Sequence, residues 1–127
     1  MTVMLDTHML LWAALGSDRL PAPAAAMIND PSQELVFSAA NIWEVVIKGS
    51  LGRKDFRVNP HTLRMRLLEN GYAELAISSE HTLAVANLPD LHKDPFDRIL
   101  IAQAQIEKLP IMTADPQFRR YQVKVLT

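Results

Sequence analysis

Short apolar runs of strand length alternate along the chain with longer segments in which apolar residues recur at helical spacing. The strand-length runs lie at residues 2–5, 35–37, 73–77, 111–113 and 123–126. The helical segments are expected at residues 7–16, 22–29, 39–49, 60–70, 79–86 and 95–108. Such alternation, with helices of about ten residues, predicts an α/β domain built on a mainly parallel sheet of four to five strands.

The residues between these segments predict where the helices start. Ser38 or Asn41 can cap the helix after the second strand, and Ser79 is expected to cap the helix that ends near Ala86. Residues 50–60 are polar and basic and are predicted to form a loop. No repeat, low-complexity tract or linker interrupts the pattern, and the length of 127 residues predicts a single domain over residues 1–127.

Composition narrows the class of protein without naming a function. Hydrophobic residues make up 49% of the chain and charged residues 21%, with a net charge of −1, as in ordinary soluble domains. Any nucleic-acid binding must therefore depend on local basic patches. The chain has no cysteine, which excludes disulfides and thiolate zinc sites. The apolar start lacks a basic leader and no stretch reaches the roughly 18 residues of a membrane helix, so we expect a cytoplasmic protein.

Acidic side chains follow the predicted strands. Asp6 and Asp115 come just after the first and fourth strands, and Glu44 lies in the helix after the second. In open parallel sheets, ligands bind beyond the carboxyl ends of the strands. Each acid alone also has an ordinary explanation. Asp6 and Asp115 can be helix caps, and Glu44 precedes Lys48 by four residues, the spacing of a helical ion pair.

Two further acids lie in the stretch "HKDPFDR" at residues 92–98. Asp94 fits a helix N-cap, because Pro95 then falls at the first helical position, where proline is favoured. Asp97 falls where a capping box carries its second partner, usually Glu or Gln, and an Asp side chain is short for that role. Capping is therefore a sufficient explanation for Asp94 and an incomplete one for Asp97.

Convergence of several carboxylates on one sheet edge would need a counter-charge. Like charges held close together repel and raise one another's pKa values. Hard divalent cations such as Mg²⁺ or Mn²⁺ relieve this repulsion, because they prefer carboxylate and water oxygens as ligands. A metal site of this kind can polarise a phosphate and activate water.

Four segments in a fixed order resemble a known family. They are "LDTHMLLW" at 5–12, "SAANIWEVVIKGSLGR" at 38–53, "HKDPFDRILIAQA" at 92–104 and "IMTAD" at 111–115. They resemble the PIN-domain ribonucleases, and most of all the VapC-type toxins of toxin–antitoxin pairs. The resemblance implies a three-layer α/β/α sandwich, an endoribonuclease that uses Mg²⁺ or Mn²⁺, a VapB-like antitoxin as partner, and a homodimer. It implies catalytic, metal-binding acids at Asp6, Glu44, Asp97 and Asp115, with the hydroxyls of Thr7 and Thr113 nearby.

Binding of RNA would also require positive charge near these acids. Candidate phosphate contacts are Lys48, Arg53, Lys54 and Arg98, and ordinary solvated surface charge is an equally good explanation for any one of them. Arg57 and Lys93 belong to the same two basic stretches. The four histidines, at 8, 61, 81 and 92, show no metal-ligand spacing, and only His8 is expected near the site.

Other functions remain as alternatives. A haloacid-type phosphatase would carry a second Asp where His8 stands, and neither a P-loop nor a dinucleotide-binding fingerprint is present. A metal-dependent nuclease or phosphatase outside toxin–antitoxin biology remains open. So does a PIN-like protein-binding module without catalysis, in which the acids are caps and ion pairs. Apolar residues at 9–13 and Met27-Ile28 can form either a dimer surface or core.

Overall fold

The computed structural model describes residues 1–127 and contains one five-stranded sheet in which every strand pair is parallel. The strand order is β3-β2-β1-β4-β5, so the first strand lies at the centre. This arrangement confirms the expected parallel α/β fold. The strands are β1 (Thr2–Leu5), β2 (Glu34–Ser38), β3 (Ala73–Leu75), β4 (Ile111–Met112) and β5 (Val125–Leu126).

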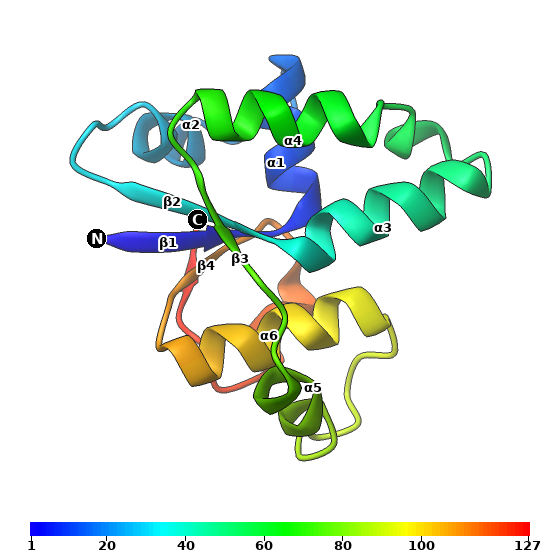
Figure 1. Cartoon of the computed structure of the whole chain (residues 1–127). Helices are drawn as coiled ribbons and strands as arrows, with labels where there is room; N and C mark the ends of the chain where they lie inside the picture. The colour runs from blue at the N-terminus through cyan, green and yellow to red at the C-terminus, as the bar shows by residue number, and fades with distance from the viewer.

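Helices cover both faces of the sheet and form a three-layer α/β/α sandwich (Figure 1). Helices α1, α2 and α4 lie on one side and α5 and α6 on the other, while α3 extends outward from the end of β2. None of them has the length and apolar character needed to cross a membrane. Their bounds are α1 (Thr7–Leu15), α2 (Ala22–Ile28), α3 (Ala39–Ser50), α4 (Pro60–Glu69), α5 (Ser79–Val85) and α6 (Pro95–Glu107).

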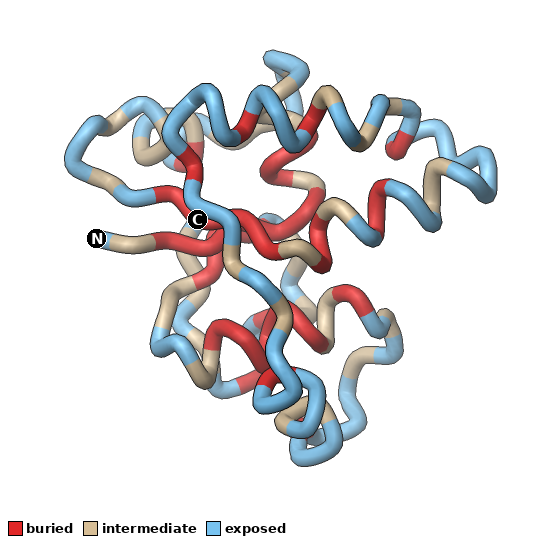
Figure 2. Tube along the Cα trace, in the orientation of Figure 1, coloured by how far each residue is buried: buried red, intermediate tan, exposed pale blue.

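Two hydrophobic clusters hold the three layers together. Successive side chains of a strand point to opposite faces. Val3 and Leu5 accordingly pack in the cluster under α1, α2 and α4, whereas Met4 packs in the cluster with α6. Buried positions concentrate in β1, β2 and the sheet-facing sides of α1 and α6 (Figure 2). The central strands are therefore fixed from both faces, which makes their carboxyl ends rigid supports.

Helix starts agree with the sequence except at α5. Ser38 caps α3 and forms a capping box with Asn41, so both candidate capping residues take part in one cap. The cap of α5 is Ser78 rather than Ser79, because the Ser78 hydroxyl accepts the backbone N–H of His81. The expected loop at 50–60 contains a short 3₁₀ turn (η1, Lys54–Phe56), which buries Phe56 against the core. A second 3₁₀ turn, η2 (Pro116–Arg120), precedes β5.

Candidate functional site

The adjacent ends of β1 and β4 bring the first two acids together. Asp6 caps α1, and its Oδ1 accepts the backbone N–H of Met9 at 2.9 Å. Its Oδ2 accepts a hydrogen bond from the hydroxyl of Thr113, at the end of β4. The same Thr113 oxygen accepts the backbone N–H of Asp115 at 3.0 Å. Asp6 therefore caps α1 and also lies in the candidate site, where it is buried and lines the same hollow as Asp115.

Helix α3 contributes Glu44, which is buried. The Thr7 hydroxyl donates to Glu44 Oε1, and the side-chain amide of Asn41 donates to that hydroxyl at 2.9 Å. Lys48, one turn further along α3, donates from Nζ to Glu44 Oε2 at 2.6 Å. Both Glu44 oxygens thus have hydrogen-bond donors within the protein, and Thr7 orients the carboxylate.

The start of α6 adds Asp94 and Asp97, with different partners. Asp94 Oδ1 accepts the backbone N–H groups of Phe96 and Asp97, and Oδ2 accepts from Lys48 Nζ at 2.9 Å. Asp97 Oδ2 lies 2.7 Å from Nε2 of His92. The predicted cap at Asp94 is present, and Asp94 also carries an ion pair that the sequence did not indicate.

Asp97 is the residue that joins the two halves of the cluster. Its carboxylate belongs to one group with Glu44 and Asp94 and to another with His92 and Asp115. Within each group, one ligand atom per residue lies within 4.8 Å of the others. A cation bound beside Asp97 would therefore have several oxygens and one imidazole nitrogen within reach.

A hollow of about 210 Å³ lies over Asp6 and Asp115 and is lined also by His8, Trp12 and Arg19. A neighbouring hollow of about 180 Å³ shares Trp12 and Arg19 with it and extends to Lys54 and Arg57. The Trp12 ring stacks obliquely on His8, with 5.7 Å between ring centroids. Asp6 and Asp115 therefore line one hollow, and the neighbouring hollow carries the basic side chains of Arg19, Lys54 and Arg57 together with Asp55.

Burial shifts the acid pKa values in the cluster. Burial raises the pKa of Asp6 to about 6, against the lowering effect of the Thr113 hydroxyl and the Met9 N–H. Burial also raises the pKa of Asp97 to about 7, with the charges of Asp94 and Glu44 adding to the effect. Carboxylic acids that hold protons near neutral pH are typical of sites that a cation completes.

Comparison with protein families identifies the fold. The family model described as PIN domain matches residues 3–124. The chain belongs to the PIN-domain family. No curated protein matches the sequence closely enough to count as a relative.

Solved structures that resemble this PIN domain come from toxin–antitoxin complexes. A chain of VapBC2 from Rickettsia felis, bound to a DNA fragment from its promoter, superposes with a TM-score of 0.70 at 14% identity, covering 99% of this chain and 98% of that one. A chain of VapBC-1 from nontypeable Haemophilus influenzae gives 0.66 at 20% identity, covering 99% and 97%. A toxin–antitoxin complex from Klebsiella pneumoniae gives 0.65 at 20% identity, covering 98% and 96%. At these identities the likeness establishes the shared fold.

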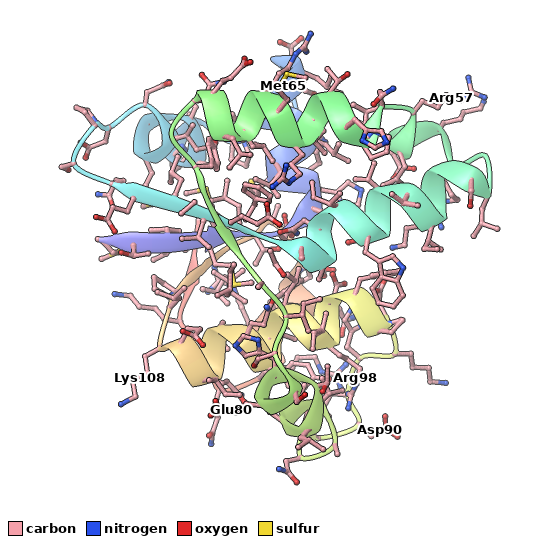
Figure 3. All side chains as sticks on the ribbon, viewed as in Figure 1. Arg57, Met65, Glu80, Asp90, Arg98 and Lys108 are labelled. Atoms are coloured by element: carbon pink, nitrogen blue, oxygen red, sulfur yellow. The ribbon has the colours of Figure 1, made fainter.

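The predicted basic residues of the PIN domain have different surroundings. Lys48 is ion-paired inside the acidic cluster. Arg98 is also engaged, because its guanidinium donates to the backbone carbonyls of Val85, Pro89 and His92 and to the Tyr121 hydroxyl. Figure 3 shows it on the side of α6 that faces α5. Arg53 and Lys54 are exposed on the turn after α3, close to Arg57.

Sequence reasoning overlooked three residues at this centre. His92 was expected to lie away from the site, and the structure corrects this, because His92 contacts Asp97. Arg19 faces the hollow over Asp6 and Asp115, although nothing in its local sequence marks it. Asp94 joins the cluster through Lys48, 46 residues away in the chain. His92 and Asp97 are five residues apart, a proximity that gives the only sequence signal among these pairs.

The donor set fits a hard divalent cation. Carboxylate oxygens suit Mg²⁺ or Mn²⁺, and Mn²⁺ also accepts an imidazole. Burial is the main cause of the raised pKa values of Asp6 and Asp97, and a cation bound beside them would favour their ionised forms. The partners that would hold the ion are Asp97 and Asp115, with His92 in the same group of ligand atoms. Asp6 adjoins Asp115 in the hollow, and Glu44 adjoins Asp97.

Proposed function

We propose that this PIN domain is a metal-dependent endoribonuclease and the toxin of a toxin–antitoxin pair. The observation that carries the proposal is the convergence of Asp6, Asp97 and Asp115 with Glu44 at the carboxyl ends of β1 and β4 and the starts of α3 and α6. A bound Mg²⁺ or Mn²⁺ would polarise the phosphate and lower the pKa of water at the site. Asp6 and Asp97 have raised pKa values, so an ion bound beside them would favour their ionised forms.

The protein's own groups would position the reacting phosphate and manage its protons. Asp6 is held by Thr113 and the α1 backbone, and Asp97 by His92, so both carboxylates keep fixed directions. Hydrolysis with water in line with the 3′ oxygen leaves a 5′-phosphate and a 3′-hydroxyl and does not use the RNA 2′-OH. A retained 2′-OH and these product ends would agree with the proposed route.

The double hollow offers a path for the RNA strand. Arg19 lies closest to the acids, and Lys54 and Arg57 lie beyond Trp12. Arginine and lysine bind phosphates in a salt-dependent manner, and an aromatic ring between them can stack on a base. In this proposal Arg53 and Lys54 contact the strand, whereas Lys48 and Arg98 support the protein itself.

The proposed toxin function also implies a protein partner, an antitoxin. The VapBC and Klebsiella structures that share the fold are complexes by their descriptions. The outer face of α3 exposes Trp43, Val46 and Ile47 on the helix that carries Glu44, and we propose that such a partner covers this face. The residues first considered for a dimer surface, at 9–13 and Met27-Ile28, mostly pack in or against the core. Homodimerisation stays a prediction.

RNA cleavage by site variants tests the nuclease proposal. We expect purified protein to cleave structured RNA in the presence of Mg²⁺ or Mn²⁺, and we expect EDTA, which chelates these ions, to abolish cleavage. Asp6→Asn and Asp97→Asn should each reduce cleavage by about 100-fold or more, because losing even a residue that supports a metal ligand costs about 10- to 100-fold. The matched control is Asp90→Asn, an exposed aspartate in the loop before α6, labelled in Figure 3, which should cleave normally.

Metal titration separates the nuclease from a protein-binding module. Divalent ions raise the melting temperature by mass action only where a site exists. We expect Mn²⁺ to raise it for the wild type and for Asp90→Asn, and far less for Asp97→Asn. Undiminished cleavage by Asp6→Asn or Asp97→Asn would refute the assignment. A wild type that neither binds Mn²⁺ nor cleaves RNA would favour the binding module.

A further inference from the structure

One cation of the protein already lies among the acids of the proposed metal centre. Lys48 Nζ is 2.6 Å from Glu44 Oε2 and 2.9 Å from Asp94 Oδ2, so a single ammonium joins α3 to the start of α6. The Lys48 side chain is only 16% exposed. Its pair with Asp94 connects residues far apart in the chain, which an ordinary helical ion pair does not do.

Several contacts hold this ammonium in place. Its Nζ lies over the rings of Phe56 and Phe96, at 5.2 and 5.6 Å from their centroids, close enough for cation–π attraction. Its two carboxylate partners are fixed in turn. The Thr7 hydroxyl binds Glu44, and the first backbone N–H groups of α6 bind Asp94. Lys48 is therefore a built-in part of the cluster and differs from the solvated lysines of the surface.

The position of Lys48 coincides with one of the two acid groups that could hold a metal. Glu44, Asp94 and Asp97 place their oxygens within 4.8 Å of one another, as do the ligand atoms of His92, Asp97 and Asp115. In the first group, Lys48 already forms ion pairs with two of the three carboxylates. A divalent ion placed there would be repelled by the ammonium a few ångströms away. No lysine or arginine forms an ion pair with Asp97 or Asp115.

We propose that Lys48 takes the place of a second divalent ion, so that the centre binds a single ion on the side of Asp6, Asp97 and Asp115. This inference rests on the proposed metal-dependent function. Lys48 is a positioning residue, acting through Glu44 and Asp94. Its fixed charge gives the buried Glu44 side chain an ion-pair partner, and leaves the half of the cluster around Asp97 and Asp115 for the exchangeable ion.

Counting bound Mn²⁺ tests this inference. Isothermal titration calorimetry with MnCl₂, paired with electron paramagnetic resonance of bound Mn²⁺, gives the number of ions per chain and shows whether two ions are magnetically coupled. We expect one ion in the wild type. In Lys48→Met, which removes the ammonium from a side chain of similar length, we expect two ions with a coupled spectrum. Lys124→Met removes an exposed lysine before β5 and should bind one ion.

The outcomes separate this inference from the proposed function. Two ions in the wild type overturn the inference and leave metal-dependent cleavage standing. A single, uncoupled ion in a folded Lys48→Met also overturns it. No bound ion in the wild type overturns the proposed function itself. If Lys48→Met does not fold, Lys48→Gln also removes the charge and should bind two ions, and a single ion there overturns the inference, whereas Lys48→Arg, which keeps the charge, should bind one ion.

Discussion

Asp94 and Asp97 lie three residues apart at the start of α6, and their carboxyl groups have opposite pKa shifts. Burial alone would raise the pKa of Asp94, but the hydrogen bond from Lys48 and those from the helix backbone lower it below its ordinary value. Burial raises the pKa of Asp97 to about 7, and the hydrogen bond from His92 only partly offsets this. One carboxylate is thus satisfied by the protein, and the other gains from an added cation.

The raised pKa values predict how stability changes with pH. Unfolded Asp6 and Asp97 ionise near 3.8, whereas the folded groups hold their protons up to about 6 and about 7. Their contribution to stability is therefore complete below 3.8 and is lost as the pH rises through these folded values. Each pKa unit corresponds to about 1.4 kcal/mol. In EDTA, Asp97→Asn should become more stable relative to the wild type between pH 4.5 and 7.5.

Thermal or urea unfolding of the two proteins across this pH range provides the measurement. The difference in unfolding free energy removes the contributions of acids far from Asp97 and keeps those of Asp94 and Glu44, whose charges act on Asp97. Saturating Mn²⁺ should reverse the order, because the ion binds the ionised wild-type carboxylate. Parallel pH profiles for the two proteins in EDTA would contradict the raised pKa of Asp97.

At the scale of elements, the start of α6 combines a helix cap with a contact between helices. Asp94 accepts two backbone N–H groups of α6 through Oδ1 and binds Lys48 of α3 through Oδ2. The two functions use different oxygens, so substitutions can separate them. Asparagine keeps a capping oxygen but loses the charge, and alanine loses both.

Asp94→Ala should therefore be less stable than Asp94→Asn by about 1 kcal/mol, the usual cost of an N-cap. Asp94→Asn should in turn be less stable than the wild type, because Lys48 loses a partly buried ionic partner. Urea unfolding with an unchanged m value measures both steps. Equal stabilities for the Asn and Ala variants would mean that the cap contributes nothing at this position.

At the scale of the whole molecule, Arg98 holds together several segments on one side of the candidate site. Its guanidinium donates to carbonyls at Val85, at the end of α5, and at Pro89 and His92 in the following loop, and to the hydroxyl of Tyr121 after η2. The Tyr121 hydroxyl in turn accepts the backbone N–H of His92 at 2.8 Å. The Arg98 guanidinium thus holds in place the loop before α6, from which His92 contacts Asp97.

Arg98→Lys should lower the free energy of unfolding by about 2 kcal/mol. The single ammonium of lysine cannot bind all the acceptors that the planar guanidinium binds, so some of the backbone carbonyls would lose their donors. RNA affinity measured well below the melting temperature should change little, because the positive charge remains. Lys108→Arg, at the far end of α6 (Figure 3), is the matched control and should leave both quantities unchanged. A stable variant with weakened RNA binding would instead place Arg98 against the substrate.

By itself, the sequence determined the features that depend on near neighbours. Apolar periodicity predicted an α/β domain on a mainly parallel sheet, since a helix and a strand each need one buried face, and the family resemblance implied the three layers. The cap at Asp94 and the Glu44–Lys48 pair were also predictable, because they join residues within one turn. The family resemblance selected Asp6, Glu44, Asp97 and Asp115 as a group, and the structure places all four at one edge of the sheet.

Tertiary structure alone decided which charges meet. Lys48 reaches Asp94 because α3 packs beside the start of α6, and Arg19, beyond the end of α1, lines the same hollow as Asp6 and Asp115. The same packing turned Arg98 inward and brought His92 onto Asp97. Such contacts depend on the relative placement of whole elements, which the summed burial of two hydrophobic clusters fixes and which no local pattern of residues encodes.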